Sequence, residues 1–353
     1  PAAVWDPKPA GLERAGRLAP GLNVTADLEA FWDGLDAVSI CTPDETHADL
    51  IVAALSRGIH VLCEKPLTDS FDGIRKILAA ESASKARLAV LHQMRFVPLF
   101  RKMKERIDAG ELGTIAYQEG YYVHDLTTRA FAYDDWRKEG RATPLVYAGC
   151  HFIDLLRWLT GEEPIEVFAA ANHRAFPAYP ESDLTVSVLR FPSTILGKVL
   201  VSIGTAGPQD HSVRVYGDRA SINNNLMFGR EGEWLGTLHR PAWLQPELLR
   251  YPGLPPWKFL THLRRNIGVQ LLTGSFNALR RFAPANNEYG AQHYPIRMYE
   301  HQRACIAAVA DFVEAVRSGG PPVCPADDSA RTVLACLAGL ESGRTNRPVA
   351  VRA

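Results

Sequence analysis

Short apolar runs alternate with amphipathic segments between residues 37 and 91, and this alternation restricts the fold more than any other feature. The runs, each of four or five residues and typical of strands buried on both faces of a sheet, are 37–41, 59–63 and 88–91. The segments between them repeat apolar residues with helical spacing; one stops at Gly58, and Ser70 caps the next. This order predicts βαβ units, in which right-handed crossovers join a parallel sheet.

The pattern changes after about residue 110, and strands follow one another without helices between them. Succession of this kind predicts an open antiparallel sheet in an α+β domain. The expected strands are 113–122, 184–191, 195–203, 212–216 and the edge strand 349–351; the expected helices are 146–159, 259–282, 297–317 and 327–342. We therefore expect a parallel α/β domain over residues 1–110 and a second domain over 111–353, with the last helices able to pack on either.

Composition excludes several classes of protein. The 39 Lys and Arg residues balance 39 Asp and Glu residues, so a nucleic-acid or anionic-membrane surface is not expected as the main partner. No apolar stretch reaches the roughly 18 residues of a membrane span, and no signal-peptide pattern opens the sequence. The six cysteines form no C-x-x-C pair, so we expect no metal site and a cytoplasmic protein with reduced thiols.

Two motifs lie directly after predicted strands, at the sheet edge where doubly wound folds bind ligands. The first contains Thr42, Pro43 and His47, and its turn presents backbone N–H groups and a hydroxyl. The second is Glu64-Lys65-Pro66, whose charged pair is costly to desolvate unless it is used. The Lys65 charge would favour a substrate alkoxide. The alternatives are an ordinary strand-to-helix turn and an ion pair at the sheet edge.

A third motif places Tyr147, His151 and Asp154 on one face of the predicted helix 146–159, by the i, i+4, i+7 rule. A histidine with a carboxylate one turn away can act as a general base, because the carboxylate orients the ring and stabilises the imidazolium. The alternative is a histidine that makes structural hydrogen bonds at a domain interface.

Taken in order, the three motifs resemble the signature of the Gfo/Idh/MocA oxidoreductases, which include glucose–fructose oxidoreductase and inositol dehydrogenase. The similarity extends over residues 4–351, with support from 94–98, 110–113 and 341–349. It implies a Rossmann domain followed by a domain whose open sheet covers the substrate and forms contacts between subunits. It also implies hydride transfer between NAD(P) and a hydroxyl or carbonyl group of a sugar, inositol or related polyol.

The resemblance implies roles for individual residues. Lys65 would be the active-site lysine, His151 the acid/base and Asp154 its supporting acid, with Tyr147 sharing substrate binding or proton transfer. Residues expected to contact the cofactor are Asp6, Thr42, Pro43, His47, Glu64, Lys65, Pro66 and Arg95.

Two features depart from the family pattern. Many members carry Asp where this chain has Tyr147, and a phenol with an ordinary pKa near 10 is a poorer resting base. The sequence also contains no G-x-G-x-x-G loop for the pyrophosphate, and residues 4–7 resemble the end of the family's second strand. Asp6 then matches the acidic residue on the adenosine ribose, which favours NAD over NADP. We expect the missing strand to leave unpaired edges in the sheet, and a strand with a glycine-rich loop to be encoded just upstream.

The predicted function is therefore an NAD(P)-dependent oxidoreductase acting on a sugar or polyol, in a homo-oligomer formed through the open sheet. A redox-neutral, NAD-dependent glycosidase-like enzyme is one alternative. A non-catalytic sugar-binding or regulatory protein on the same scaffold is another.

Overall fold

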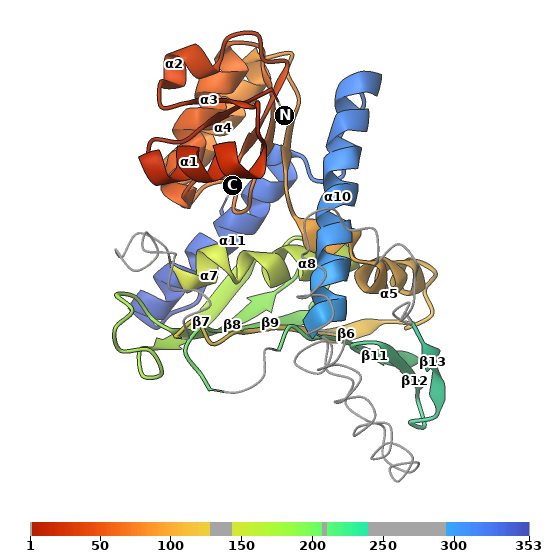
Figure 1. Ribbon diagram of the computed structural model, residues 1–353. Helices are drawn as coiled ribbons and strands as arrows, with labels where there is room; N and C mark the ends of the chain where they lie inside the picture. The colour runs from red at the N-terminus through yellow and green to blue at the C-terminus, as the bar shows by residue number, and fades with distance from the viewer. Residues whose placement is uncertain (1, 128–142, 207–209, 239–293, 353) are drawn as a thin grey trace.

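The computed structural model describes residues 2–127, 143–206, 210–238 and 294–352. They form an N-terminal α/β half and a second half built on one large sheet, and helix α11 runs from one half to the other (Figure 1). The expected helix 259–282 lies outside the described residues. No described helix has the length and apolar character of a membrane span.

The N-terminal half contains β1 (Ala3–Trp5), α1 (Pro9–Leu18), β2 (Asn23–Thr25), α2 (Leu28–Phe31), β3 (Ala37–Ile40), the 3-10 helix η1 (Asp44–Thr46), α3 (His47–Ser56), β4 (His60–Cys63), α4 (Phe71–Ala83), β5 (Leu88–Val90) and the 3-10 helix η2 (Gln93–Phe96). The three predicted strands are present as β3, β4 and β5, all parallel. The predicted α/β class is therefore confirmed.

The parallel strands form two separate sheets rather than one. Strands β1 and β2 pair with each other, and β3, β4 and β5 form the second sheet, so β1 and β3 each have an edge that no other described strand pairs with. Unpaired strand edges of this kind are expected from the sequence. The β3–β5 sheet still buries apolar side chains against helices, because α3 packs on β3 and β4 and supplies Ile51, Ala54 and Leu55 to the core. No residue of β1 or β2 is buried.

The second half contains α5 (Pro98–Asp108), β6 (Ile115–Val123), α7 (Pro144–Tyr147), α8 (Cys150–Thr160), β7 (Glu166–Asn172), β8 (Leu184–Arg190), β9 (Leu196–Ser202), β10 (Val213–Gly217), β11 (Ala220–Asn223), β12 (Leu226–Gly229), β13 (Trp234–Thr237), α10 (Tyr294–Ser318), α11 (Ala326–Thr345) and β14 (Val349–Ala350). Its described strands form a nine-stranded sheet in the order β13-β12-β11-β10-β6-β9-β8-β7-β14. The sheet is mixed rather than purely antiparallel, because β6 and β9 are parallel neighbours.

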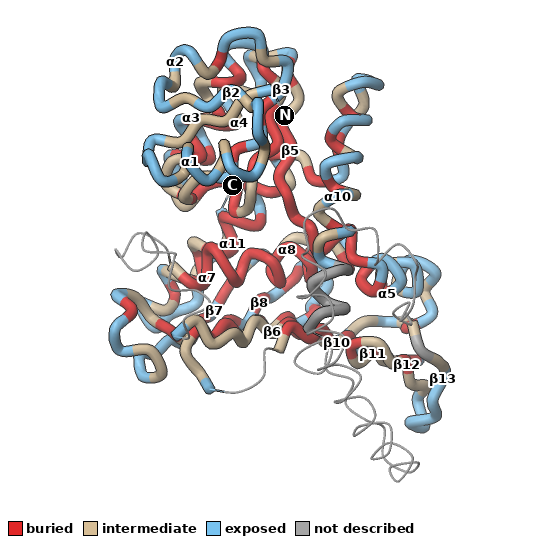
Figure 2. Tube along the Cα trace, viewed as in Figure 1, coloured by how far each residue is buried: buried red, intermediate tan, exposed pale blue. Residues whose placement is uncertain are grey.

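Helices α7 and α8 cover the face of this sheet that is turned toward the N-terminal half, and no described helix covers the opposite face (Figure 1). Contact on the covered face is close: a Cβ at Gly120 of β6 would lie 2.7 Å from the Phe152 ring of α8. The buried residues therefore gather in two layers, one around β3–β5 and one between α8 and the sheet (Figure 2).

Helix α11 contributes to both hydrophobic cores. Ala330 and Val333 pack in the N-terminal core, whereas Ala335 and Cys336 pack in the core of the second half. Helix α5 precedes residue 110, but its buried side chains also belong to the second core.

Candidate active site

The carboxyl ends of three parallel strands bring the first two motifs to one edge of the sheet. Ile40 lies opposite Cys63, and Cys63 lies opposite Val90, so the strands end at the same level. The loops that follow therefore lie side by side, as the sequence predicts.

His47 joins the first two of these loops. Its ring is fully buried, with Nδ1 2.8 Å from the Pro66 carbonyl oxygen and Nε2 3.0 Å from the Thr42 carbonyl oxygen. The first loop is held further by Thr46, whose hydroxyl donates to the Pro43 carbonyl. His47 holds these two ligand-edge loops together, and its expected contact with the cofactor stays a prediction.

Lys65 follows β4 and reaches the second half of the molecule. Its ammonium donates to the Tyr147 carbonyl oxygen over 2.8 Å. That carbonyl is available because the predicted continuous helix 146–159 is wrong: α7 ends at Tyr147, and α8 begins at Cys150. Across the break the His151 amide donates to Ala148 rather than to Tyr147.

The break follows from close packing at Gly149, where a Cβ would lie 2.4 Å from the Leu145 carbonyl oxygen. Tyr147, His151 and Asp154 therefore do not share one face of a single helix.

The Lys65 ammonium lies among groups that favour its charge. Burial acts to lower the pKa of Lys65, but Cys150 and the carboxylates of Asp44 and Glu64 outweigh it, and the net pKa is raised. Glu64 is held close by, since its carboxylate accepts the Lys65 backbone N–H at 3.2 Å. The lysine is therefore a cation at neutral pH, suited to stabilising an oxyanion.

His151 lies at the start of α8, beside aromatic and imidazole rings that sequence reasoning missed. Tyr122 of β6 is nearly parallel to the His151 ring, at 6.2 Å between centroids and 6° between planes. His211 stacks on Tyr122 at 4.5 Å, and the Tyr122 hydroxyl lies 3.5 Å from Nδ1 of His124. The alternation of side chains along β6 could have predicted this position. Tyr122 lies two residues after Gly120, so both face α8.

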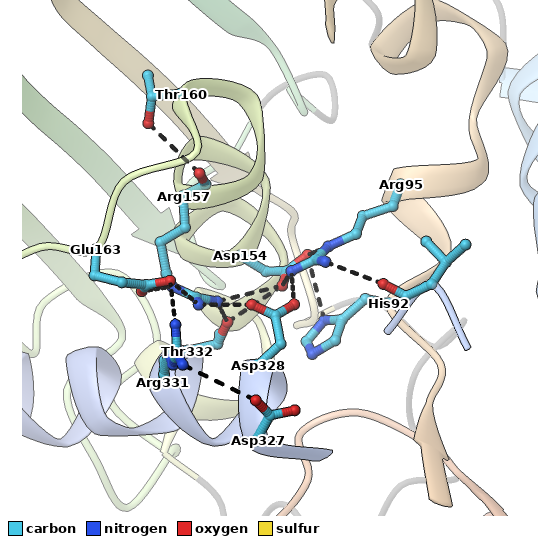
Figure 3. A network of polar contacts seen from close by, with 11 residues as sticks. His92, Arg95, Asp154, Arg157, Thr160, Glu163, Asp327, Asp328, Arg331 and Thr332 are labelled. Atoms are coloured by element: carbon cyan, nitrogen blue, oxygen red, sulfur yellow. Dashed lines mark hydrogen bonds and ion pairs between the residues drawn. The ribbon is translucent and has the colours of Figure 1, made fainter. Parts of the chain in front are cut away.

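Asp154 occupies a different environment from the one predicted. Its carboxylate accepts two hydrogen bonds from Arg95, at 2.6 and 2.9 Å, and a third from the hydroxyl of Thr332 (Figure 3). Burial alone would raise the pKa of Asp154, but the charges of Arg95 and His92 lower it to about 2. Asp154 was expected to support His151, and Arg95 to contact the cofactor. The structure pairs the two with each other in the interior, and both expected roles stay predictions.

Asp6 directly follows β1, as the sequence predicts for an acidic residue on the adenosine ribose. Its Oδ1 atom accepts the backbone N–H of Lys8 at 2.8 Å, just before α1. A Cβ at Gly11 would lie 2.0 Å from Oδ2, so this glycine keeps room for the carboxylate.

The described residues contain no group of three or more His, Cys, Asp or Glu side chains placed to hold a metal ion. The cysteines that the structure describes are free thiols; most are buried, and Cys41 is exposed beside the first motif.

Two family models match the chain and between them cover more than half of it. Residues 1–92 match the NAD-binding Rossmann fold of an oxidoreductase family, and residues 100–223 match the GFO/IDH/MocA C-terminal domain. The chain belongs to the Gfo/Idh/MocA family of oxidoreductases. The predicted family, fold class and nicotinamide cofactor are thereby confirmed.

Curated relatives from the family are similar over part of their length. Inositol 2-dehydrogenase of Rhizobium meliloti is 35% identical over 224 residues, which are 62% of this chain and 66% of that protein. The rhizopine catabolism protein MocA of the same organism is 28% identical over 66% of this chain and 72% of its own length. The chain thus spans just under two thirds of the first of these proteins.

Solved structures share the fold over nearly the whole chain. The myo-inositol 2-dehydrogenase from Lactobacillus plantarum has a TM-score of 0.74 at 18% identity, covering 99% of this chain and 91% of its own. An oxidoreductase from Agrobacterium radiobacter, solved with NAD⁺, L-tartaric acid and magnesium, has a TM-score of 0.75 at 17% identity, covering 99% of this chain and 90% of its own.

Two of the residues expected to contact the cofactor lie at strand ends of the α/β half. Asp6 lies at a strand end with its carboxylate beside Gly11, and Lys65 presents a cation at the ends of β3–β5. The described residues supply no glycine-rich loop for the pyrophosphate, and β1 and β3 belong to separate sheets.

Proposed function

We propose that the protein is an NAD-dependent oxidoreductase that converts a CH–OH group of inositol, a sugar or a related polyol to the ketone, or the reverse. One observation carries the proposal: the Lys65 ammonium, at the ligand edge of the α/β half, is hydrogen-bonded to Tyr147, four residues before His151. The sequence motifs from the two halves thus converge. The curated relatives named inositol 2-dehydrogenase support this substrate class.

The roles follow from the chemistry of each group. When bound, NAD⁺ accepts the hydride from the substrate carbon. The charge of Lys65 stabilises the alkoxide that develops on the substrate oxygen, and His151 takes the hydroxyl proton. Tyr147, which is buried, would help to bind the substrate.

Asp6 would hold the adenosine ribose, and its carboxylate would disfavour the 2′-phosphate of NADP. Thr42, Pro43, Glu64 and Pro66 would shape the nicotinamide end of the site, because their loops adjoin Lys65.

The decisive experiment compares Lys65→Ala with Lys102→Ala, a matched change at an exposed lysine on α5. We expect Lys65→Ala to lower kcat at least 100-fold on the best substrate of a polyol panel, with NADH binding by fluorescence titration retained. Lys102→Ala should behave like wild type. Unchanged turnover in Lys65→Ala would contradict the proposal.

Net NADH formation separates this function from a redox-neutral glycosidase-like reaction. A dehydrogenase produces one NADH per turnover, whereas an enzyme that oxidises its substrate transiently produces none. Product formation without absorbance change at the nicotinamide wavelength would favour the redox-neutral enzyme.

We also propose that the uncovered face of the large sheet forms a contact between identical subunits. Its strands β7, β8 and β9 expose Phe168, Val188 and Leu196, which are 39%, 39% and 46% accessible. Light scattering should show an oligomer that Val188→Lys weakens. A wild-type monomer at micromolar concentration would contradict this.

A further inference from the structure

A buried ion-pair network lies where the two halves of the molecule meet. Arg95 and Asp154 form a two-pronged pair, and their side chains are 5% and 0% exposed. Arg95 also lies 2.5 Å from Asp328, and Arg157 lies 2.9 Å from the same carboxylate. Figure 3 shows these groups converging from three elements.

Each element belongs to a different part of the fold. Arg95 is in η2, directly after β5 of the α/β half; Asp154 is in α8, on the large sheet; Asp328 is in the first turn of α11, which packs in both cores. The network therefore fixes α8 relative to the ligand edge of the parallel strands.

Such a network is a poor way to gain stability. Removing guanidinium and carboxylate groups from water costs several kcal/mol per ion, and apolar side chains of similar volume often stabilise as well or better. Two-pronged pairing between Arg and a carboxylate instead supplies a directional contact of defined geometry. The network of Arg95, Asp154 and Asp328 is therefore better explained by a need for fixed geometry at this junction than by a gain in stability.

The site depends on that geometry. His151 lies one helical turn before Asp154 on α8, and the Tyr147 carbonyl that binds Lys65 precedes the same helix. A shift of α8 along the junction would move His151 and the partner of Lys65 together, relative to the strand that carries Lys65.

We propose that Arg95 and Asp154 are positioning residues, whose ion pair holds α8 so that His151 and Lys65 act on the same substrate oxygen. This inference rests on the proposed function. It assigns neither residue a contact with cofactor or substrate.

The test uses Asp154→Asn, which keeps the shape of the side chain and removes its charge. We expect kcat to fall by about 10- to 100-fold, because a displacement near 1 Å can cost about 100-fold, while the Kd of NADH stays within about twofold. Amine labelling of Lys65, read by mass spectrometry, should become faster as its bond to Tyr147 loosens. A residue important for stability alone would change neither quantity well below Tm.

The matched control is Asp327→Asn, at the neighbouring position of α11, where the carboxylate is exposed and 3.9 Å from Arg331. It should leave kcat and Lys65 labelling unchanged. Combining Arg95→Gln with Asp154→Asn should cost no more than the worse single variant, because the two residues act as one unit. Arg95→Lys, which keeps the charge and loses the fork, serves the same test if Asp154→Asn does not fold.

The outcomes separate this inference from the proposed function. If Lys65→Ala abolishes turnover but Asp154→Asn and Arg95→Lys keep wild-type kcat and labelling, the positioning role is wrong and the function stands. If Lys65→Ala leaves turnover intact, the proposed function itself fails.

Discussion

At the scale of single residues, His92 and Asp154 lie 3.7 Å apart in the interior and respond to pH in different windows. Burial lowers the pKa of His92 to about 4, and the charge of Arg95 adds to this, although the carboxylates of Asp154 and Asp328 oppose it. Neither ring nitrogen of His92 has a hydrogen-bond partner among the described residues. His92 is therefore neutral in the folded protein at pH 7.

His92→Gln tests this environment. The unfolded chain takes up the proton at about pH 6.5 and the folded chain only near pH 4, so wild type loses up to about 3 kcal/mol of stability as pH falls between these values. In urea unfolding, the free energy of unfolding of His92→Gln should not show this loss as pH falls. Asp154 contributes at lower pH, since a carboxyl pKa near 2 gives stability that is lost only below about pH 4. If the free energy of unfolding depends on pH equally in wild type and His92→Gln above pH 4, His92 is not a buried neutral histidine.

Glu119 carries a second buried charge. Its side chain lies on the face of the large sheet that no described helix covers, and neighbouring side chains bury it. Its carboxylate pairs with Lys198 and Arg214, each at 2.8 Å, and accepts from the hydroxyls of Tyr117 and Tyr121. Burial acts to raise its pKa, but these four donors lower it to about 2.

Glu119→Gln should lower the free energy of unfolding by about 2 to 4 kcal/mol at pH 7, because two cations lose their shared partner. Glu166→Gln, which breaks a more exposed pair with Arg190, should cost less than about 1 kcal/mol. Equal effects of the two changes in chemical denaturation would show that the Glu119 network is solvated.

Residue types at strand ends were predictable, but their partners were not. Thr42 and Lys65 lie at the ligand edge because parallel strands end there, a consequence of topology that the sequence pattern carries. The pairing of Asp154 with Arg95 depends on how α8 and η2 pack. His211 reaches Tyr122 and His124, at the end of β6, from a distant part of the chain. Contacts of this kind are fixed by tertiary packing, which local spacing does not encode.

At the scale of elements, the interruption between α7 and α8 decides where the Lys65 ammonium binds. Gly149 has helical backbone angles, so its role is to permit close approach and not to allow an unusual conformation. A Cβ there would also lie 2.8 Å from Cδ1 of Leu145 and 3.1 Å from Val201.

Gly149→Ala should therefore destabilise the protein by about 1 to 3 kcal/mol through overpacking. Gly16→Ala is the matched control, since nothing lies within 4 Å of a Cβ at that position of α1. There the gain in helix propensity should stabilise by up to about 1 kcal/mol. Thermal unfolding of both variants distinguishes the two cases, and a neutral Gly149→Ala would contradict the packing argument.

Long elements with strong periodicity were predicted well. The helices 297–317 and 327–342 correspond to α10 and α11 within a few residues, and the edge strand after them pairs with β7. The α7–α8 break was missed because apolar spacing continues across it, and β1, β2 and β11–β13 are too short to give a clear period.

At the scale of the whole molecule, α11 makes the two halves depend on each other. Val333 is 1% exposed in the N-terminal core, and Cys336 is fully buried in the other core one turn later. A rigid helix shared in this way couples the unfolding of both halves.

Val333→Ala, which removes two buried methyl groups, should cost about 2 kcal/mol. Because the halves are coupled, hydrogen exchange measured by mass spectrometry should accelerate in β8 as much as in β4. Acceleration confined to residues 37–91 would mean that the halves unfold separately.

The same helix has a consequence for synthesis. The ribosome makes α11 after nearly all other described elements, so both cores lack the side chains of this helix until it has left the exit tunnel. A nascent chain that ends after β13 presents the unfilled α11-binding surfaces of both halves at once. In a nascent chain, these surfaces therefore stay exposed to solvent until α11 has been made.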